Sequence, residues 1–274
     1  MFRLAISCLT AVLTVGLAAG PALADQLRPW GLWTQDPASP TMRQITNLHD
    51  VIAVIIALVV VFVFGLLGYI CVRFRASRNP QPAKWTHNTA LEVIWTLVPV
   101  LILVAIAFPS FRLLYAMDRV KDADMTLKAI GHQWYWSYDY VDQKISFDAS
   151  LVQDGDLKPG QLRLLTTDIH VVLPVNTNVR ILTTSDDVIH SWSVPALGIK
   201  LDAFPGRLNE TWVRIDKPGT YYGQCSQLCG INHGFMPIQV EAVTKEQFTA
   251  WVAQNQAKQK SSSAGSKILA DANQ

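Results

Sequence analysis

The sequence predicts a membrane-anchored all-β protein, in which a two-helix transmembrane hairpin precedes a sandwich or barrel of short strands. Two uncharged apolar runs in the first half predict the helices, and short alternating segments separated by turns in the second half predict the strands. Composition agrees, because 50% of the 274 residues are apolar and only 16% are charged, against about 25% in a typical soluble domain. The 23 Lys and Arg residues nearly balance 21 Asp and Glu residues, which argues against a nucleic-acid binder.

Residues 1–24 have the pattern of a signal peptide. Arg3 provides a positive start, an apolar stretch runs from Leu4 to Leu17, and Ala22-Leu23-Ala24 supplies the small residues of a cleavage site. The alternative is an uncleaved anchor helix, which the small-residue pattern disfavours. After cleavage, residues 25–50 are expected as an exported N-terminal segment.

Two uncharged runs predict the transmembrane hairpin over residues 51–112. Val51 to Val72 has 22 residues and Val93 to Phe111 has 19, so as helices they measure ~33 and ~28 Å, enough to cross a hydrocarbon core of about 30 Å. The loop between them carries only positive charges before the first acid, namely Arg73, Arg75, Arg78 and Lys84. This loop is therefore expected on the cytoplasmic side, and the rest of the chain on the exported side.

Glu92 stands at the cytoplasmic start of the second run, where an ionisable side chain is costly unless water or a partner reaches it. Two interpretations stay open. Glu92 is either a functional acid at the mouth of the span or an ordinary acid that the helix dipole favours in a first helical turn. Pro99 and Pro109 are expected to kink this helix.

Residues 125–245 predict the β-domain, because short apolar segments alternate there with Gly- and Pro-containing turns. The segments with the clearest strand pattern are Leu162–Leu165, His170–Leu173, Val179–Thr183, Thr211–Ile215 and Ile238–Val243. Residues 246–274 are expected to form a short helix, with Phe248 and Trp251 on its apolar face, and then a disordered tail rich in Ser, Gln and Lys.

The residues that carry chemistry gather between Cys225 and Met236, in the order C-x3-C-x3-H-x2-M. Thiolates with imidazole select copper, zinc or iron–sulfur, and a nearby thioether favours copper, since zinc has little use for methionine. The C-x-x-C-H motif of covalent haem is absent from the sequence. A disulfide between Cys225 and Cys229 is the alternative, because exported thiols usually oxidise. His190, expected in a turn after a strand, offers a second imidazole, although a single histidine in such a place is more often structural.

With these motifs the chain resembles subunit II of a haem–copper cytochrome c oxidase of the alphaproteobacterial and mitochondrial type. The resemblance extends from the first apolar run to about Val243. It rests on several long motifs in the same order: His87-Asn88-Thr89 with Leu91-Glu92-Val93, Gly131-His132-Gln133-Trp134-Tyr135-Trp136-Ser137-Tyr138, Asp187-Val188-Ile189-His190-Ser191-Trp192, Asp202-Ala203-Phe204-Pro205-Gly206-Arg207, and the cysteine motif.

The resemblance implies a cupredoxin-like Greek-key β-barrel that holds the dinuclear copper centre called CuA. The two thiolates are implied to bridge both copper ions, while one imidazole on each ion and two weak axial ligands complete the set. The implied ligands are His190, Cys225, the backbone carbonyl of Gln227, Cys229, His233 and Met236.

The resemblance also implies a redox role. Cytochrome c is expected to deliver electrons at Trp134, and the copper centre to pass them to haem in subunit I, where oxygen is reduced to water and protons are translocated. Glu92 is implied to lie at the start of a proton path that serves subunit I. The expected partners are subunits I and III, cytochrome c and the lipid bilayer, with the copper domain in the periplasm above a bacterial inner membrane.

The chain departs from the family pattern at Gln227, where the family usually has a glutamate whose carboxylate ligates magnesium at the boundary with subunit I. A neutral amide is a poorer ligand for this hard cation, so magnesium is doubtful here. The alternative function is a membrane-anchored periplasmic copper carrier. A copper carrier would not explain Trp134, Glu92 or the two predicted transmembrane helices.

Overall fold

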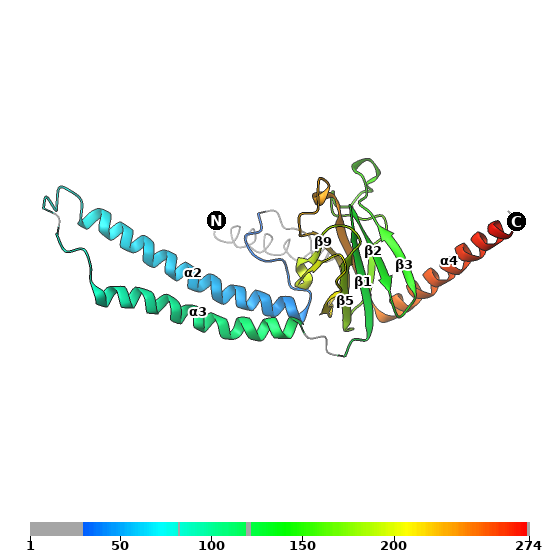
Figure 1. The fold of residues 1–274 in the computed structure, drawn as a ribbon, viewed down its shortest axis with the longest axis horizontal. Coiled ribbons are helices and arrows are strands. Elements are labelled where there is room, and N and C mark those ends of the chain that lie inside the picture. The colour runs from blue at the N-terminus through cyan, green and yellow to red at the C-terminus, as the bar shows by residue number, and fades with distance from the viewer. Residues whose placement is uncertain (1–29, 82, 119–121, 273–274) are drawn as a thin grey trace, which may run out of the picture.

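The computed structural model describes residues 30–81, 83–118 and 122–272, with side chains as far as Gln259. The predicted signal peptide lies outside the described residues. Two long helices lead into a β-domain, and a further helix leaves that domain on its other side (Figure 1). The predicted fold class, a helical hairpin followed by an all-β domain, is confirmed.

Helices α2 (Pro40–Arg73) and α3 (Thr89–Asp118) lie side by side as a hairpin (Figure 1). Both helices are long and apolar enough to cross a membrane, and none of their most apolar stretches is buried within the chain. Large apolar side chains that face outward in this way need lipid or another subunit around them. Each helix extends beyond the uncharged run that predicted it, and both Pro99 and Pro109 lie inside α3.

The β-domain consists of two five-stranded sheets. In spatial order the first sheet contains β3 (Ile145–Ala149), β2 (Tyr135–Tyr140), β1 (Met125–His132), β5 (Val179–Ser185) and β8 (Asn209–Val213). The second contains β4 (Val171–Pro174), β10 (Pro237–Val243), β9 (Gly219–Cys225), β6 (His190–Val194) and β7 (Ile199–Ala203). The β1–β5 and β4–β10 pairs are parallel and the other strand pairs are antiparallel.

The core of the β-domain lies between the two sheets. Strand β1 alternates strictly between buried and half-buried residues, so one of its faces points into the core. The largest fully buried side chains are Trp136, Trp192, Tyr138, Tyr140 and Tyr221. Two of these side chains are linked by a hydrogen bond from Trp192 Nε1 to the Tyr138 hydroxyl, 3.2 Å long, so the indole has a partner although it is buried. A packed, rigid core of this kind holds the loops at its ends in fixed positions.

Two sequence predictions about secondary structure are wrong. Leu162–Leu165 forms a turn instead of a strand, because the Leu162 carbonyl accepts hydrogen bonds from the backbone N–H groups of Leu165 and Thr166, 3.2 and 3.1 Å long. The last helix, α4 (Lys245–Ala272), runs on through the segment expected as a disordered tail. That segment has no proline and is rich in Ala, Lys and Gln, which favour helix. The start of α4 packs on the domain as expected, with Trp251 against Tyr140 at 5.0 Å between ring centroids.

Candidate metal centre

Three segments bring the sulfur and imidazole groups together at one edge of the second sheet. His190 is the first residue of β6, and Cys225 is the last residue of β9. Because β6 and β9 are neighbouring antiparallel strands, these two ends meet at the same edge. The chain then turns through Cys229 and the short 3-10 helix η4 (His233–Phe235), and Met236 follows just before β10.

The thiols of Cys225 and Cys229 form the middle of this cluster, with their sulfurs 3.8 Å apart. Both are free thiols, so the disulfide alternative does not describe this structure. His190 Nδ1 lies 3.9 Å from the Cys225 sulfur, and His233 Nδ1 lies 3.5 Å from the Cys229 sulfur. The Met236 sulfur is also 3.5 Å from that of Cys229. The Gln227 carbonyl oxygen is 3.3 Å from the Cys225 sulfur, while the Gln227 side chain is exposed.

Most of these groups are shielded from water. His190 is fully buried, and Cys225, Cys229 and Met236 each keep no more than 5% of their surface exposed. Within the described part of the chain, ligand atoms of His190, Cys225 and Cys229 lie within 4.8 Å of one another, a spacing suited to a metal ion. Buried thiol and imidazole groups whose ligand atoms face one another, with lone pairs still available, are typical of a metal site.

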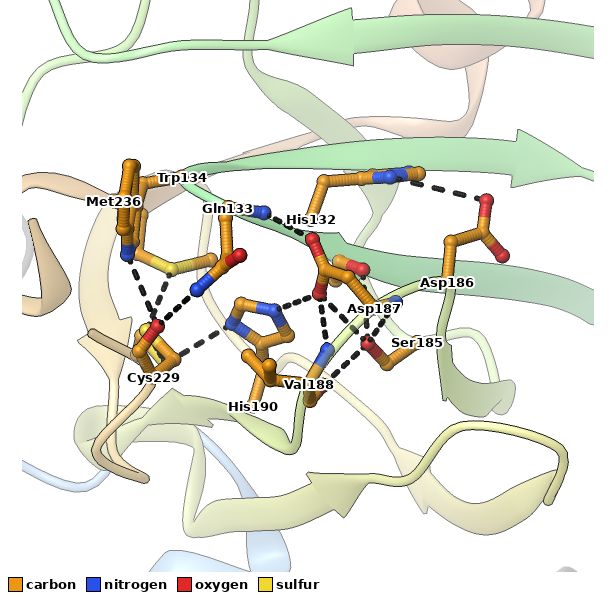
Figure 2. Close-up of polar contacts among 12 residues, drawn as sticks. His132, Gln133, Trp134, Ser185, Asp186, Asp187, Val188, His190, Cys229 and Met236 are labelled. Atoms are coloured by element: carbon orange, nitrogen blue, oxygen red, sulfur yellow. Dashed lines mark hydrogen bonds and ion pairs between the residues drawn. The ribbon is translucent and has the colours of Figure 1, made fainter.

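Asp187 fixes the orientation of the His190 ring. Its carboxylate lies 2.8 Å from His190 Nε2 (Figure 2). This contact leaves Nδ1 on the side of Cys225, 3.9 Å from its sulfur. Asp187 is itself held by the backbone N–H groups of Val188 and Gln133, at 2.6 and 2.7 Å. Ser185 completes the arrangement, since its hydroxyl donates to the Val188 carbonyl, lies 3.1 Å from the Gly131 carbonyl, and accepts from the Asp187 backbone N–H at 3.2 Å. Such outer partners of a ligating histidine set its tautomer and basicity.

These contacts shift the ionisation of the cluster. Burial alone would lower the pKa of His190, but hydrogen bonds with Cys225 and Asp187 raise it above the ordinary value. Burial would also raise the pKa of the Cys225 thiol, yet the His190 ring and nearby backbone groups lower it. The pKa of the Cys229 thiol is raised, by burial and by the adjacent charge of Cys225. One thiolate is thus readily formed, while two adjacent thiolates need a cation between them.

Two glycines make room for this arrangement. A Cβ at Gly131 would lie 2.6 Å from the His190 ring, so only glycine lets β1 approach the imidazole. Gly230 has a φ of +120°, which favours glycine, and a Cβ there would lie 3.0 Å from the Trp134 ring. Both glycines belong to the motifs that carry the family resemblance.

Trp134 lies against the metal cluster from the side of the first sheet. Its indole nitrogen donates to the Cys229 carbonyl at 3.2 Å, and the Gln133 side-chain amide donates to the same oxygen at 2.9 Å (Figure 2). The Trp134 side chain is half-buried, so part of the ring faces solvent. The structure thus places the predicted electron-accepting residue one hydrogen bond from a predicted ligand.

Glu92 lies apart from this cluster. It belongs to the first turn of α3, and the structure places that turn at the end of the hairpin remote from the β-domain (Figure 1). Asn88 caps this turn, because its side-chain oxygen accepts from the Leu91 backbone N–H at 3.1 Å. Both interpretations of Glu92 as an acid at a helix start agree with this position.

Sequence reasoning missed the roles of Asp187, Gln133 and Ser185. Asp187 stood only as the first residue of a family motif, without a role of its own, although an aspartate three positions before a candidate histidine ligand in a turn is a usable signal. Gln133 and Ser185 gave no such signal, because the Cys229 carbonyl beside Gln133 is 96 residues away and the Gly131 carbonyl beside Ser185 is 54 residues away.

A β-sandwich anchored by two apolar helices, with two buried thiols, a buried thioether, one buried and one half-buried imidazole, defines a membrane-anchored cupredoxin-like domain with a candidate metal site. Family comparison takes the assignment further. Residues 125–243 match the model of the cytochrome c oxidase subunit II periplasmic domain, and residues 27–113 match the model of the transmembrane domain of the same subunit. The chain belongs to the family of cytochrome c oxidase subunit II.

Individual relatives agree with this assignment. The chain is 52% identical over 231 residues to a probable cytochrome c oxidase subunit 2 of Rickettsia bellii, covering 84% of this chain and 86% of the relative. It is 49% identical over 239 residues to cytochrome c oxidase subunit 2 of Oenothera berteroana, covering 85% and 93%. A solved periplasmic domain of subunit II from Bradyrhizobium japonicum is 49% identical, with a TM-score of 0.48, and covers 51% of this chain and 99% of that one. The family models and the sequence identity to these curated relatives make the chain a membrane subunit of a haem–copper oxidase of the respiratory chain.

Proposed function

We propose that the β-domain holds the dinuclear copper centre CuA, which accepts electrons from cytochrome c and passes them to haem in subunit I for reduction of oxygen to water coupled to proton translocation. The observation that carries this proposal is the pair of buried thiols 3.8 Å apart with one imidazole beside each sulfur. When bound, the copper centre supplies one-electron redox chemistry. The surrounding protein residues hold its ligands in place.

The donor set fits copper. Thiolate, imidazole and thioether donors are soft or intermediate, which suits copper better than a hard cation. Cys225, Cys229, His190 and His233 would hold the copper ions, with two weaker donors beside them. These weak donors are the thioether of Met236 and the backbone carbonyl of Gln227.

The protein around the cluster contributes rigidity. Asp187 holds the His190 ring, Gly131 lets that ring pack against β1, and the carbonyl of Cys229 is held by both Gln133 and Trp134. A site whose ligands are held before binding undergoes little rearrangement when an electron arrives, and that favours fast transfer.

The test of the proposal is electron paramagnetic resonance of the purified full-length chain after loading with copper. An unpaired electron shared equally between two copper nuclei supports the dinuclear centre. A spectrum from one copper nucleus, or a silent sample with a single bound Cu(I), supports the alternative of a membrane-anchored periplasmic copper carrier.

Trp134 is proposed as the point where electrons from cytochrome c enter, because its half-exposed ring is hydrogen-bonded to the Cys229 carbonyl. Trp134→Phe keeps an aromatic ring but removes the N–H donor. Because substitutions next to a metal ligand typically cost about 10–100-fold in activity, a slowing of electron uptake in that range is expected. Stopped-flow oxidation of reduced cytochrome c by the assembled oxidase measures it. Trp30→Phe, at a ring that is 97% exposed, serves as the control, and an unchanged rate in Trp134→Phe would contradict the proposal.

Glu92 is proposed as the start of a proton path that serves subunit I, on the cytoplasmic side. Glu92→Gln keeps the shape of the side chain but removes the ionisable group, so oxygen consumption and proton uptake should slow. The copper signal should stay unchanged, because Glu92 lies at the far end of the hairpin from the β-domain. Glu246→Gln, an exposed acid of α4, is the control. Equal rates in the Glu92→Gln oxidase and the wild type would identify Glu92 as an ordinary first-turn acid.

The proposed topology places the copper domain in the periplasm above a bacterial inner membrane. The end of α2 and the segment after it carry Arg73, Arg75 and Arg78, at the end of the hairpin remote from the β-domain, and positive charge of this kind favours the cytoplasmic side. The outward-facing apolar surfaces of α2 and α3 would then meet lipid and subunits I and III.

The described residues do not favour magnesium beside the copper centre. At the position between the two cysteines the side chain is the neutral amide of Gln227, which is exposed. A hard divalent cation prefers carboxylate oxygen, so no role is assigned to magnesium in this chain.

A further inference from the structure

We propose that Ser39 is a positioning residue that fixes the copper domain on the transmembrane hairpin. This inference rests on the proposed function only in its consequence for electron transfer. The hydroxyl of Ser39 is fully buried and makes two hydrogen bonds to different parts of the fold. It accepts from the Met42 backbone N–H at 2.9 Å, which caps α2, and it donates to the Leu197 carbonyl of the β-domain at 2.8 Å.

The backbone on both sides of Ser39 continues the same junction. The Ala38 N–H donates to the Ala196 carbonyl at 3.0 Å, and the Ala38 carbonyl accepts from the Asp216 N–H at 2.9 Å. An ion pair between Arg43, in the first turns of α2, and Asp216 adds to these bonds. The N-terminal end of α2 is thus tied to two separate segments of the β-domain.

Close packing reinforces the junction. Gly198 has a φ of +71°, and a Cβ there would lie 3.0 Å from the Met42 nitrogen and from the Ile45 side chain. Gly198 and Leu197 lie at the end of the 3-10 helix η3 (Pro195–Leu197), which directly follows β6. Since β6 begins with the candidate ligand His190, a short rigid segment joins the cap of α2 to the metal cluster.

Helix α3 is bound to strand β8 of the first sheet. Its last carbonyl groups have no partner within the helix, and two side chains of β8 supply donors. Trp212 Nε1 donates to the Ala116 carbonyl at 3.1 Å, and the Thr211 hydroxyl donates to the Met117 carbonyl at 3.2 Å. Helix α3 is thus held by β8 of the first sheet, while α2 is held by η3, which follows β6 of the second sheet, and by Asp216. Contacts at these separate points oppose rotation of the domain about either helix axis. Of these contacts, the Ser39 hydroxyl is the one that is fully buried and bonded on both sides of the junction.

Hydrogen exchange of the full-length chain in lipid nanodiscs tests the junction without any copper. Ser39→Ala removes both hydrogen bonds, so the Ala38 and Asp216 amides should exchange roughly tenfold faster, as for loss of a helix cap together with a buried hydrogen bond. Ser39→Thr keeps the hydroxyl and should restore slow exchange.

Asn88→Ala is the matched control, because Asn88 caps α3 by a similar bond but belongs to the far end of the hairpin. It should leave the Ala38 and Asp216 amides unchanged. Unchanged exchange of these amides in Ser39→Ala, or equal acceleration in Asn88→Ala, would overturn the proposal.

The functional consequence is measured in the assembled oxidase. In Ser39→Ala, electron transfer from copper to haem after a light-induced pulse of electrons should slow, while the copper spectrum stays the same as in the wild type. A normal transfer rate together with fast amide exchange would overturn the role in electron transfer. Failure of the proposed function is distinguishable, because the wild-type chain would then show no paired-copper spectrum although its junction amides remain protected.

Discussion

Cys225→Ser should abolish the paired-copper spectrum and reduce oxygen consumption driven by cytochrome c by more than about 100-fold, since even loss of an outer partner of a metal ligand costs about 10–100-fold. A serine hydroxyl occupies nearly the same space as the thiol, but it is a hard donor and does not deprotonate near neutral pH. The sulfur of Cys225 lies 3.8 Å from the Cys229 sulfur and 3.9 Å from His190 Nδ1. The substitution therefore removes one of the two thiolates that would hold the proposed copper centre.

The chain offers a matched control for this substitution. Cys71 is an exposed free cysteine in α2, so Cys71→Ser makes the same chemical change outside the metal cluster. Cys71→Ser should leave the copper spectrum and oxygen consumption at the wild-type level. A paired-copper spectrum retained by Cys225→Ser would show that the Cys225 thiolate does not hold the copper ions, and it would exclude the proposed centre.

Trp192→Ala should destabilise the β-domain by about 3–5 kcal/mol, the usual cost of truncating a buried tryptophan. The Trp192 side chain is fully buried between the sheets, and its register position on β6 is opposite Cys225. The substitution leaves a cavity beneath the metal cluster and removes the hydrogen bond that the indole gives to Tyr138. A buried tyrosine hydroxyl that loses its partner adds to the cost.

Urea unfolding of the full-length chain in detergent, followed by near-ultraviolet circular dichroism, measures this loss. Ile169→Ala is the control within the same domain, because Ile169 is 47% exposed and a surface truncation changes stability by about 0.5 kcal/mol or less. A loss below about 1 kcal/mol in Trp192→Ala would mean that the domain closes around the cavity, contrary to the rigid packing described above.

The site was predictable from the sequence where its donors are close together in the chain. Cys225, Cys229, His233 and Met236 fall within twelve residues, and their chemical types alone favour copper. His190 joined them only through the family resemblance, since a single histidine 35 residues earlier carries no metal signal of its own. His190 lies beside Cys225 in space because strands β6 and β9, which carry these two residues, are paired neighbours in the sheet.

The fold shows the same division. Long uncharged runs predicted α2 and α3, because the hydrocarbon core selects for length and low charge regardless of tertiary context. Periodicity at Leu162–Leu165 predicted a strand that does not form, since hydrogen bonds to the Leu162 carbonyl close a turn there. The length of α4 was also underestimated, because composition typical of disorder is equally compatible with helix.

The sequence by itself determined the membrane anchor, the all-β domain and the softness of the metal donors, because these depend on composition, periodicity and local spacing. Only the tertiary structure decided that Asp187 orients His190, that Trp134 and Gln133 hold the Cys229 carbonyl, and that Ser39 joins the hairpin to the domain. The Ser39 contact spans 158 residues, and the Gln133 and Trp134 contacts span 96 and 95. Contacts of such separation are set by how the strands pair and pack, and that information is not contained in any local stretch of the chain.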